Sequence, residues 1–292
     1  MNKFDELFKQ YNCNLNDDLV RAEVAELIDQ HFDENNTKAV HAQCFNCIDL
    51  TSLNSTDTDA QIIALTKKVN DFKQSFANTE NVAAICVYPS LVQVVSEHLA
   101  ETIQIASVAA GFPASQTFIE VKVAETAMAV MEGATEIDVV MSIGKFLEGK
   151  YQDVYEELSE IKAACRNAQL KVIIESGALP SASAIKMASI LAMASGADFI
   201  KTSTGKTAVS ATLEAAYIMC QAISEWNKNT GVKVGFKAAG GVVTTNDAVK
   251  YYTVVKNTLG AEWLNNSLFR IGASKLANNL LSSIEEKEIA YF

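Results

Sequence analysis

Short runs of apolar, β-rich residues recur along the chain and alternate with segments of helical spacing. Eight such runs predict strands, over residues 45–50, 82–88, 103–109, 136–142, 171–176, 198–204, 234–240 and 269–274. Apolar residues return every three or four positions between them, which predicts helices over 60–75, 118–132, 154–166, 183–194 and 212–226. Strand and helix therefore alternate from residue 44 onward, as in α/β folds with a parallel sheet.

Eight parallel strands with crossover helices fit either a closed (β/α)8 barrel, the TIM barrel, or an open doubly wound sheet. The barrel is favoured because unusual polar residues stand at the carboxyl ends of many different strands. Residues 1–43 precede the first strand and predict one or two amphipathic helices, for instance over 18–28. We expect this N-terminal helical extension to cap the bottom of the barrel or to join an oligomer contact, and residues 44–292 to form the barrel of a single-domain protein.

Length and composition fit one large domain. With 292 residues, 49% of them hydrophobic, the chain can bury a sizeable core without a second unit. Asp and Glu outnumber Lys and Arg by 35 to 24, and the net charge of −11 argues against a general role on nucleic acid or an anionic membrane. An anionic ligand therefore has to be bound by a local cluster of lysines.

The N-terminal segment and the cysteines together indicate a reducing cellular compartment. Residues 1–18 are mixed and acidic rather than a signal peptide, and no apolar run is long enough to cross a bilayer. Most of the six cysteines lie in apolar segments, where free thiols act as small hydrophobic groups. Cys86 either faces the barrel mouth as a reactive thiol or is packed and inert. These features predict a cytoplasmic protein with reduced thiols.

Two motifs that suggest other chemistry fail on spacing. Cys44 and Cys47 form one CxxC with His41 nearby, but no second pair follows at zinc-site spacing, so we expect packing and no metal. The string TGKT suggests a nucleotide-binding P-loop, but the first glycine of that motif would fall on Ile200. We therefore predict neither a metal site nor nucleotide hydrolysis.

Lysines stand in two neighbouring predicted strands. Lys201 follows Phe199 and Ile200 in DFIKTSTGK, and Lys237 stands in VGFKAAGG. Burial and a second positive charge both lower the pKa of a lysine, which produces an amine able to attack a carbonyl. Each lysine taken singly fits a structural ion pair with a carboxylate equally well. Two of them on adjacent strands favour the catalytic interpretation.

Two aspartates have comparable surroundings. Asp138 is flanked by Ile137 and Val139 in the fourth predicted strand, across the barrel mouth from the two lysines. There it could hold one lysine charged or relay protons through water. Asp49, in CIDLTSLN on the first strand, fits either such a role or a structural ion pair.

Glycine-rich turns follow the sixth, seventh and eighth predicted strands. They contain Gly205 beside Lys206, the pair Gly240 and Gly241, and the turn that starts at Gly272. At these positions barrels gather backbone N–H groups around a phosphate. The sequence thus predicts a phosphorylated substrate.

At these residues the chain resembles the deoxyribose-phosphate aldolases, which are class I, Schiff-base aldolases. The resemblance covers nearly the whole barrel and is carried by CIDLTSLNSTDT, AAICVYPSLV, SVAAGFPASQT, GATEIDVVMSIG, LKVIIESG, GADFIKTSTGK, VGFKAAGGV and LFRIGAS. It implies that Lys201 forms the Schiff base, that Lys237 activates it, and that Asp138 works with Lys237 in proton relay. No metal or organic cofactor is implied.

The resemblance also implies a substrate site. Asp49 and Thr51 would lie near the sugar hydroxyls, and the phosphate would be surrounded by Gly205, Lys206, Gly240, Gly241, Gly272 and Ser274.

This chain departs from the family pattern at three places. Family members often carry an arginine two residues after the paired glycines and a small residue after the GAS turn, where this chain has Val243 and Lys275. We expect Lys275 either to supply the phosphate-binding cation or to point into solvent as a surface lysine. A C-terminal tyrosine assists proton transfer in some members, and the role of Tyr291, which Phe292 follows, stays open.

The implied reaction is the reversible cleavage of 2-deoxy-D-ribose 5-phosphate to D-glyceraldehyde 3-phosphate and acetaldehyde. Another phosphorylated sugar is the enzymatic alternative, because a Schiff base fixes the reaction type more firmly than the substrate. A catalytically silent barrel that binds sugar phosphates would have no reason to keep two lysines and an aspartate in apolar strands. The expected partners are small phosphorylated sugars and aldehydes, and a homodimer stays open.

Overall fold

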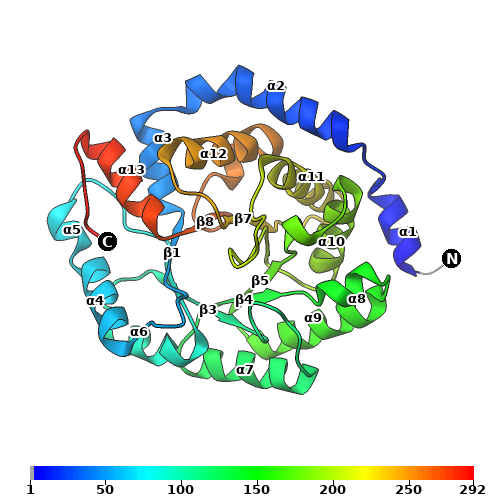
Figure 1. Ribbon diagram of the computed structural model, residues 1–292, viewed down its shortest axis with the longest axis horizontal. Helices are drawn as coiled ribbons and strands as arrows, with labels where there is room; N and C mark the ends of the chain where they lie inside the picture. The colour runs from blue at the N-terminus through cyan, green and yellow to red at the C-terminus, as the bar shows by residue number, and fades with distance from the viewer. Residues whose placement is uncertain (1–2) are drawn as a thin grey trace.

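Eight short parallel strands close into a barrel at the centre of the molecule. The computed structural model describes residues 3–292, and Figure 1 looks down the barrel. Each strand pairs in parallel with the next one along the chain, and β1 pairs with β8, which closes the sheet. The strands are β1 (Ile48–Thr51), β2 (Ala84–Val87), β3 (Gln104–Ala109), β4 (Glu136–Val140), β5 (Gln169–Ile173), β6 (Phe199–Lys201), β7 (Gly235–Ala239) and β8 (Phe269–Ala273). The predicted TIM barrel is confirmed.

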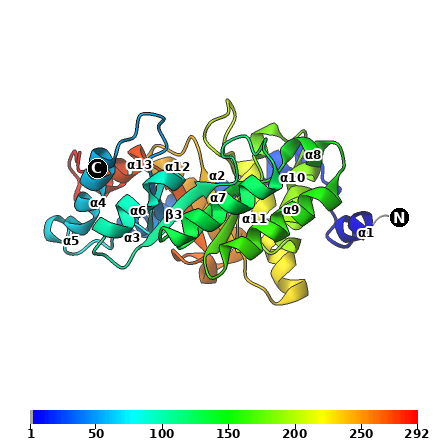
Figure 2. The same cartoon turned by 90° about the horizontal axis from the view of Figure 1, so that it is seen from below.

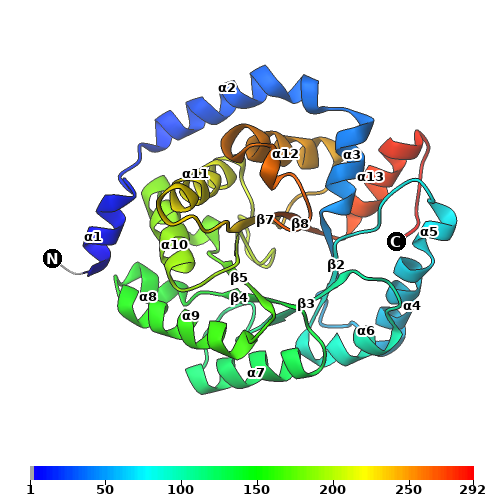
Figure 3. The same ribbon diagram turned by 180° about the vertical axis from the view of Figure 1, so that it is seen from behind.

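A ring of helices surrounds the strands, as Figure 3 shows from the opposite face, and in the side view of Figure 2 helices cover the flank of the barrel. The helices are α1 (Lys3–Gln10), α2 (Asp17–Asn35), α3 (Lys38–Asn46), α4 (Asp59–Asn70), α5 (Phe72–Ser75), α6 (Val92–His98), α7 (Ile119–Met131), α8 (Ile143–Leu147), α9 (Tyr151–Cys165), α10 (Ala182–Ala194), α11 (Leu213–Thr230), α12 (Thr245–Leu259) and α13 (Lys275–Glu285), with 3₁₀ turns η1 (Pro89–Leu91), η2 (Ser176–Ala178) and η3 (Ala261–Trp263). Capping boxes at Thr58 and Thr244 explain where α4 and α12 begin. Every helix predicted from apolar spacing is present, although the one over 60–75 is divided at Asp71.

The predicted strands are correct in number and order but extend too far at their ends. Phe45 belongs to α3, and its ring stacks on Phe72 with 5.1 Å between the ring centroids. β6 ends at Lys201, and at Thr202 the side-chain hydroxyl joins the pairing through hydrogen bonds with the backbone of Ala239. An apolar run in a sequence marks burial rather than backbone pairing, so it cannot place these boundaries.

The N-terminal extension contains three helices rather than one or two. Along the outside of the ring, α2 packs on α11 and α12, while α3 packs on α12 and α13 (Figure 1). At the N-terminal ends of the strands lies a pocket of about 630 Å³, and none of residues 3–43 lines it. The expectation that the extension caps the bottom of the barrel is therefore wrong, because its helices pack against the outer helices α11, α12 and α13. An oligomer contact stays a prediction.

The interior of the barrel is apolar on one side and ionic on the other. Side chains from β2 and β3 form a small apolar cluster with Leu53, namely Ala84, Cys86, Ala106 and Val108. The remaining strands contribute charged side chains that are at most 3% exposed, namely Asp49, Glu136, Asp138, Lys171, Lys201, Lys237 and Arg270. Aliphatic layers usually fill such barrels, so an ion network at this place points to a function.

Candidate active site

Two lysines and one aspartate meet at the carboxyl end of the barrel. Lys201 and Lys237 are cross-strand neighbours on β6 and β7. Asp138 reaches them from β4, and its Oδ2 atom accepts a hydrogen bond from each Nζ atom at 2.7 Å. The structure thus brings the three residues singled out in the sequence into direct contact.

The two lysines differ in how strongly they hold a proton. Burial lowers the pKa of Lys201, and the charge of Lys237 lowers it further, against the opposing effect of Asp138. Burial also acts to lower the pKa of Lys237, but Asp138 and Asp49 more than offset it and raise that pKa. Lys201 is therefore the lysine that becomes a neutral amine first, while Lys237 stays an ammonium.

Asp138 is an ionised carboxylate despite its burial. Burial acts to raise its pKa, but Lys171, Lys201 and Lys237 together hold the pKa of Asp138 well below its usual value. Its Oδ1 atom lies 3.2 Å from Lys171 Nζ, so both carboxylate oxygens face ammonium groups. Such a carboxylate fixes the position of Lys201 Nζ.

Sequence reasoning missed three members of the buried ion network. Lys171 contacts Glu136 and lies 3.4 Å from Asp49 Oδ2. Arg270 is 2.6 Å from Asp49 Oδ1 and 2.7 Å from Glu136 Oε1. Glu136, Lys171 and Arg270 each stand beside apolar residues in a largely buried strand, which is the signal that identified the lysines at the mouth. The same test, applied to the beginnings of the strands, would have found them.

Asp49 does not line the mouth pocket. It is fully buried, and its carboxylate oxygens contact Lys237, Lys171 and Arg270. Burial acts to raise the pKa of Asp49, but these three cations hold it below its usual range. The expected contact of Asp49 with a sugar hydroxyl stays a prediction. The alternative interpretation, a structural ion pair, describes its contacts.

A pocket of about 330 Å³ opens beside Lys201 at the mouth. The turns after β6, β7 and β8 converge on it, together with the loop after β1. The other residues expected around the substrate all line this pocket: Thr51, Gly205, Lys206, Gly240, Gly241, Gly272, Ser274 and Lys275. The pocket therefore has an amine at one end and glycine turns with two further lysines around it.

Glu175 fixes the loop after β6 and was not expected from the sequence. Its buried carboxylate accepts hydrogen bonds from the Thr204 backbone N–H at 3.2 Å and from the Thr204 hydroxyl at 2.7 Å. The Thr204 hydroxyl oxygen in turn accepts from the backbone N–H of Lys206 at 3.0 Å. Lys206 Nζ donates to the carbonyl of Leu53, so this lysine ties the loop after β6 to the loop after β1.

The N-terminus of α13 faces the same pocket. Ser274 is its N-cap residue and makes no side-chain capping hydrogen bond, and Lys275 is its first residue. Backbone N–H groups in the first turn of a helix favour an anion. Val243, in the loop after β7, contributes an apolar side chain to the pocket. Lys275 lines this pocket and is also exposed, so a phosphate-binding cation and a surface lysine both stay predictions.

Tyr291 packs away from this pocket. Its ring contacts Phe72 and Phe76, and its hydroxyl donates to the carbonyl of Lys68 at 2.7 Å. These contacts lie on the outer side of the barrel, where the C-terminus appears in Figure 1. Tyr291 is not among the residues that line the mouth pocket, and its contacts give it a packing role here.

The thiols are buried. Cys86 is fully buried in the apolar half of the barrel, and burial raises the pKa of its thiol, which matches the packed and inert alternative. Cys44 and Cys47 are also fully buried, and burial raises the pKa of each. Residues 3–292 contain no cluster of three potential metal ligands. Among the described helices, none combines the length and apolar character that crossing a membrane requires.

Comparison with known proteins identifies the family. Residues 44–274 match the model described as DeoC/LacD family aldolase. The chain belongs to this family. The Homo sapiens protein named deoxyribose-phosphate aldolase is 41% identical over 251 residues, which cover 82% of this chain and 78% of the relative. The protein of that name from Bos taurus is 41% identical over 252 residues, with the same shares of the two chains.

Solved structures agree with this assignment. The structure described as QR15, an aldolase, is 27% identical and has a TM-score of 0.68 over 83% of this chain and 96% of that one. The family, the relatives and the fold together make this protein an enzyme, a class I aldolase of the deoxyribose-phosphate aldolase family and hence a lyase.

Proposed function

We propose that this aldolase reversibly cleaves 2-deoxy-D-ribose 5-phosphate to D-glyceraldehyde 3-phosphate and acetaldehyde through a Schiff base on Lys201. The observation that carries the proposal is that the two lysines in contact with Asp138 have pKa values shifted in opposite directions. Lys201 borders the pocket and its pKa is lowered, whereas Lys237 keeps its proton. The names of the human and bovine relatives support the choice of substrate.

In this mechanism the amine of Lys201 adds to the C1 aldehyde of the open-chain sugar, and loss of water gives an iminium. The C3 hydroxyl then loses its proton, the C2–C3 bond breaks, and its electron pair passes into the iminium to form an enamine. Glyceraldehyde 3-phosphate leaves at this point. A proton returns to C2 of the enamine, and water hydrolyses the iminium to release acetaldehyde and the free amine.

Asp138 and Lys237 are the groups that we propose handle these protons. Both Nζ atoms lie 2.7 Å from Asp138 Oδ2, so a proton that leaves Lys201 stays within one hydrogen-bonded cluster. The ammonium of Lys237 disfavours a second positive charge on Lys201 and is itself a proton donor. Water in the pocket would complete the path to the substrate carbons.

A substrate panel tests the choice of sugar. We expect the highest kcat/KM for 2-deoxyribose 5-phosphate, and much lower values for ribose 5-phosphate and for ketose phosphates. Higher activity on another phosphorylated sugar would contradict the proposed substrate but not the proposed Schiff base. Absence of turnover with any phosphorylated sugar would favour a silent, sugar-phosphate-binding barrel.

Lys275 is expected to bind the substrate phosphate. A charge-assisted hydrogen bond contributes about 1.5 to 3 kcal/mol. Lys275→Ser should therefore lower kcat/KM for the phosphorylated sugar by roughly ten-fold or more. Steady-state kinetics with unphosphorylated 2-deoxyribose should show a much smaller effect, because that substrate lacks the anion.

A compensating substitution provides the matched control. Val243→Arg added to Lys275→Ser returns a cation to the same pocket from the loop after β7, and it should restore part of the lost kcat/KM. Equal effects of Lys275→Ser on the phosphorylated and unphosphorylated sugars would make Lys275 an ordinary surface lysine.

Gly240 and Gly241 allow a test of the pocket's shape. Both have positive φ, 84° and 81°, but a methyl group on Gly240 would lie 2.6 Å from Ser210 Cβ and 2.9 Å from Gly205 Cα. On Gly241 it would meet nothing within 4 Å. We expect Gly240→Ala to displace the loop after β6 and lower kcat/KM by about ten-fold or more, and Gly241→Ala to cost less because only backbone strain acts there. Equal losses in the kinetics of the two variants would refute a steric role for Gly240.

Cytoplasmic location and a homodimer stay predictions. The deoxyribose phosphate aldolase from Aeropyrum pernix, described as having a unique tetrameric structure, is 23% identical and shares the fold with a TM-score of 0.67 over 88% of this chain and 96% of that one. Light scattering on the purified protein would measure its assembly.

A further inference from the structure

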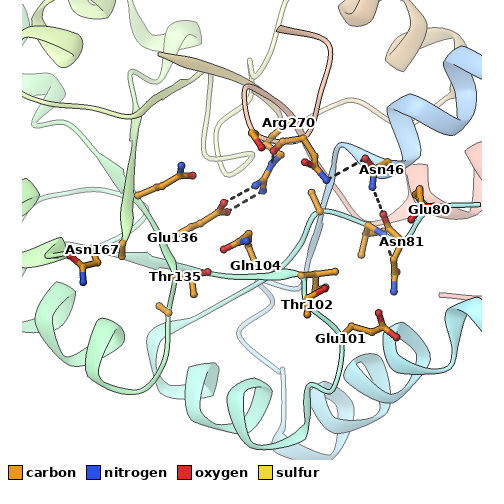
Figure 4. A pocket seen from close by; sticks show the side chains of 18 of the residues that line it. Asn46, Glu80, Asn81, Glu101, Thr102, Gln104, Thr135, Glu136, Asn167 and Arg270 are labelled. Atoms are coloured by element: carbon orange, nitrogen blue, oxygen red, sulfur yellow. Dashed lines mark hydrogen bonds and ion pairs between the residues drawn. The ribbon is translucent and has the colours of Figure 1, made fainter. Parts of the chain in front are cut away.

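One connected ion network runs through the barrel from the active-site mouth to the opposite end. It consists of four cations, Lys171, Lys201, Lys237 and Arg270, and three carboxylates, Asp49, Glu136 and Asp138. Figure 4 shows the lower end, where the guanidinium of Arg270 faces the carboxylate of Glu136 in the pocket at the N-terminal ends of the strands. The pair is joined by hydrogen bonds of 2.7 Å and 3.1 Å.

The number of charges in this network depends on the state of Lys201. When Lys201 is a neutral amine, three cations face three carboxylates. When it is an ammonium, one positive charge has no counter-charge among residues that are at most 3% exposed. An uncompensated charge at such burial is costly, so the network as a whole disfavours the protonated form.

We propose that Lys171 and Arg270, which do not line the mouth pocket, are positioning residues that keep Lys201 uncharged through the charge balance of the buried network, with Glu136 as the carboxylate that both of them contact. The inference rests on the proposed function, because it concerns the amine that forms the Schiff base. Lys171 is central to it, since its Nζ atom contacts Glu136 and lies 3.2 Å from Asp138 Oδ1, the carboxylate that holds Lys201.

Within residues 3–292, the part of the chain that the structure describes, no other strand supplies a compensating charge. Cys86 on β2 is the remaining titratable side chain that faces Lys201, and burial raises the pKa of its thiol, which keeps it neutral. β3 carries no titratable residue. Burial acts to lower the pKa of both Lys171 and Arg270, but the surrounding carboxylates more than offset it, so both stay charged.

The test is the pH dependence of kcat/KM in the full-length enzyme. Lys171→Met leaves two permanent cations against three carboxylates, so Lys201 becomes the missing third cation and its pKa rises. The acidic limb of the profile should move up by about one pH unit or more, which lowers kcat/KM about ten-fold at neutral pH and lets it recover in alkaline buffer. A uniform loss at every pH would mean that Lys171 is merely structural and would overturn the proposal.

Removing a carboxylate together with the lysine provides the decisive control. Lys171→Met combined with Glu136→Gln restores equal numbers of cations and carboxylates around a neutral Lys201, so its acidic limb should return to the wild-type position. Glu136→Gln alone should leave that limb unmoved or shift it downward. A double variant that keeps a raised limb would overturn the proposal even if the single lysine variant fails to fold.

Adduct formation on Lys201 and the pH profile of Lys171→Met test the proposed function and the charge balance separately. Wild-type enzyme that forms no reducible adduct on Lys201 with acetaldehyde would contradict the proposed function itself. An adduct on Lys201 in the wild type, with an acidic limb that Lys171→Met does not move, would contradict only the charge-balance inference.

Discussion

Replacing Lys201 by leucine should abolish turnover, with kcat lower by on the order of 10⁴-fold or more. The substitution removes the amine that the mechanism requires, and Lys237 cannot replace it as the nucleophile because its raised pKa keeps it protonated. The fold should survive, because Asp138 keeps its contacts with Lys237 and Lys171 and the remaining cations match the carboxylates. Steady-state assays and circular dichroism measure the two effects.

The matched control for this variant is an exposed lysine. Lys233 precedes the N-terminal end of β7, does not line the mouth pocket, and forms a surface ion pair with Glu262 at 2.7 Å. Lys233→Met should keep nearly all activity, since exposed ion pairs contribute little to stability. Activity of Lys201→Leu within ten-fold of the wild type would remove Lys201 from the mechanism.

Replacing Lys237 by leucine should lower activity at neutral pH by on the order of 100-fold and change its pH dependence. Without the neighbouring ammonium, the pKa of Lys201 rises, so the neutral amine becomes rarer at any pH below the new value. The residual rate should therefore climb with pH through the neutral and alkaline range, by up to about ten-fold per unit.

A pH profile of kcat/KM for Lys237→Leu measures this coupling directly. A profile of wild-type shape with a uniform loss would show that Lys237 acts in some way other than through the charge of Lys201. The prediction concerns the free enzyme, because kcat/KM reports the ionisation of groups before the substrate binds.

The alternation of strands and helices could be predicted from the sequence because it is local. Apolar periodicity changes between strand and helix within a few residues, and eight repeats of that change limit the fold to very few topologies. Lys201 and Lys237 could be placed side by side for the same reason, since consecutive strands are neighbours in a parallel barrel. The glycine-rich turns after β6, β7 and β8 were expected to surround one site, and they line the same pocket.

The lower half of the ion network could not be predicted, because it depends on closure of the barrel. Arg270 on the last strand meets Glu136 on the fourth and Asp49 on the first, and nothing local in the sequence relates these residues. The sequence alone therefore leaves open whether Asp49 forms a structural ion pair. Closure of the barrel brings its carboxylate into contact with Lys171, Lys237 and Arg270.

The path of the N-terminal extension was also beyond local reasoning. Its helices are recognisable from capping residues such as Asn16 and Thr37, whose side chains accept hydrogen bonds from the first turns of α2 and α3. These helices pack on the outer surfaces of α11, α12 and α13. The sequence does not show where those surfaces lie relative to the extension. Glu175 was missed for a related reason, since its partner Thr204 lies on the next strand's loop.

The central claim is that Lys201 forms the Schiff base, and trapping tests it most directly. The enzyme is reduced with borohydride in the presence of acetaldehyde, digested, and mapped by peptide mass analysis. The mechanism predicts one added ethyl group on the peptide that carries Lys201, none on Lys237, and no labelling of Lys201→Leu. A label on Lys237 in place of Lys201, or an unlabelled enzyme that still turns over its substrate, would contradict it.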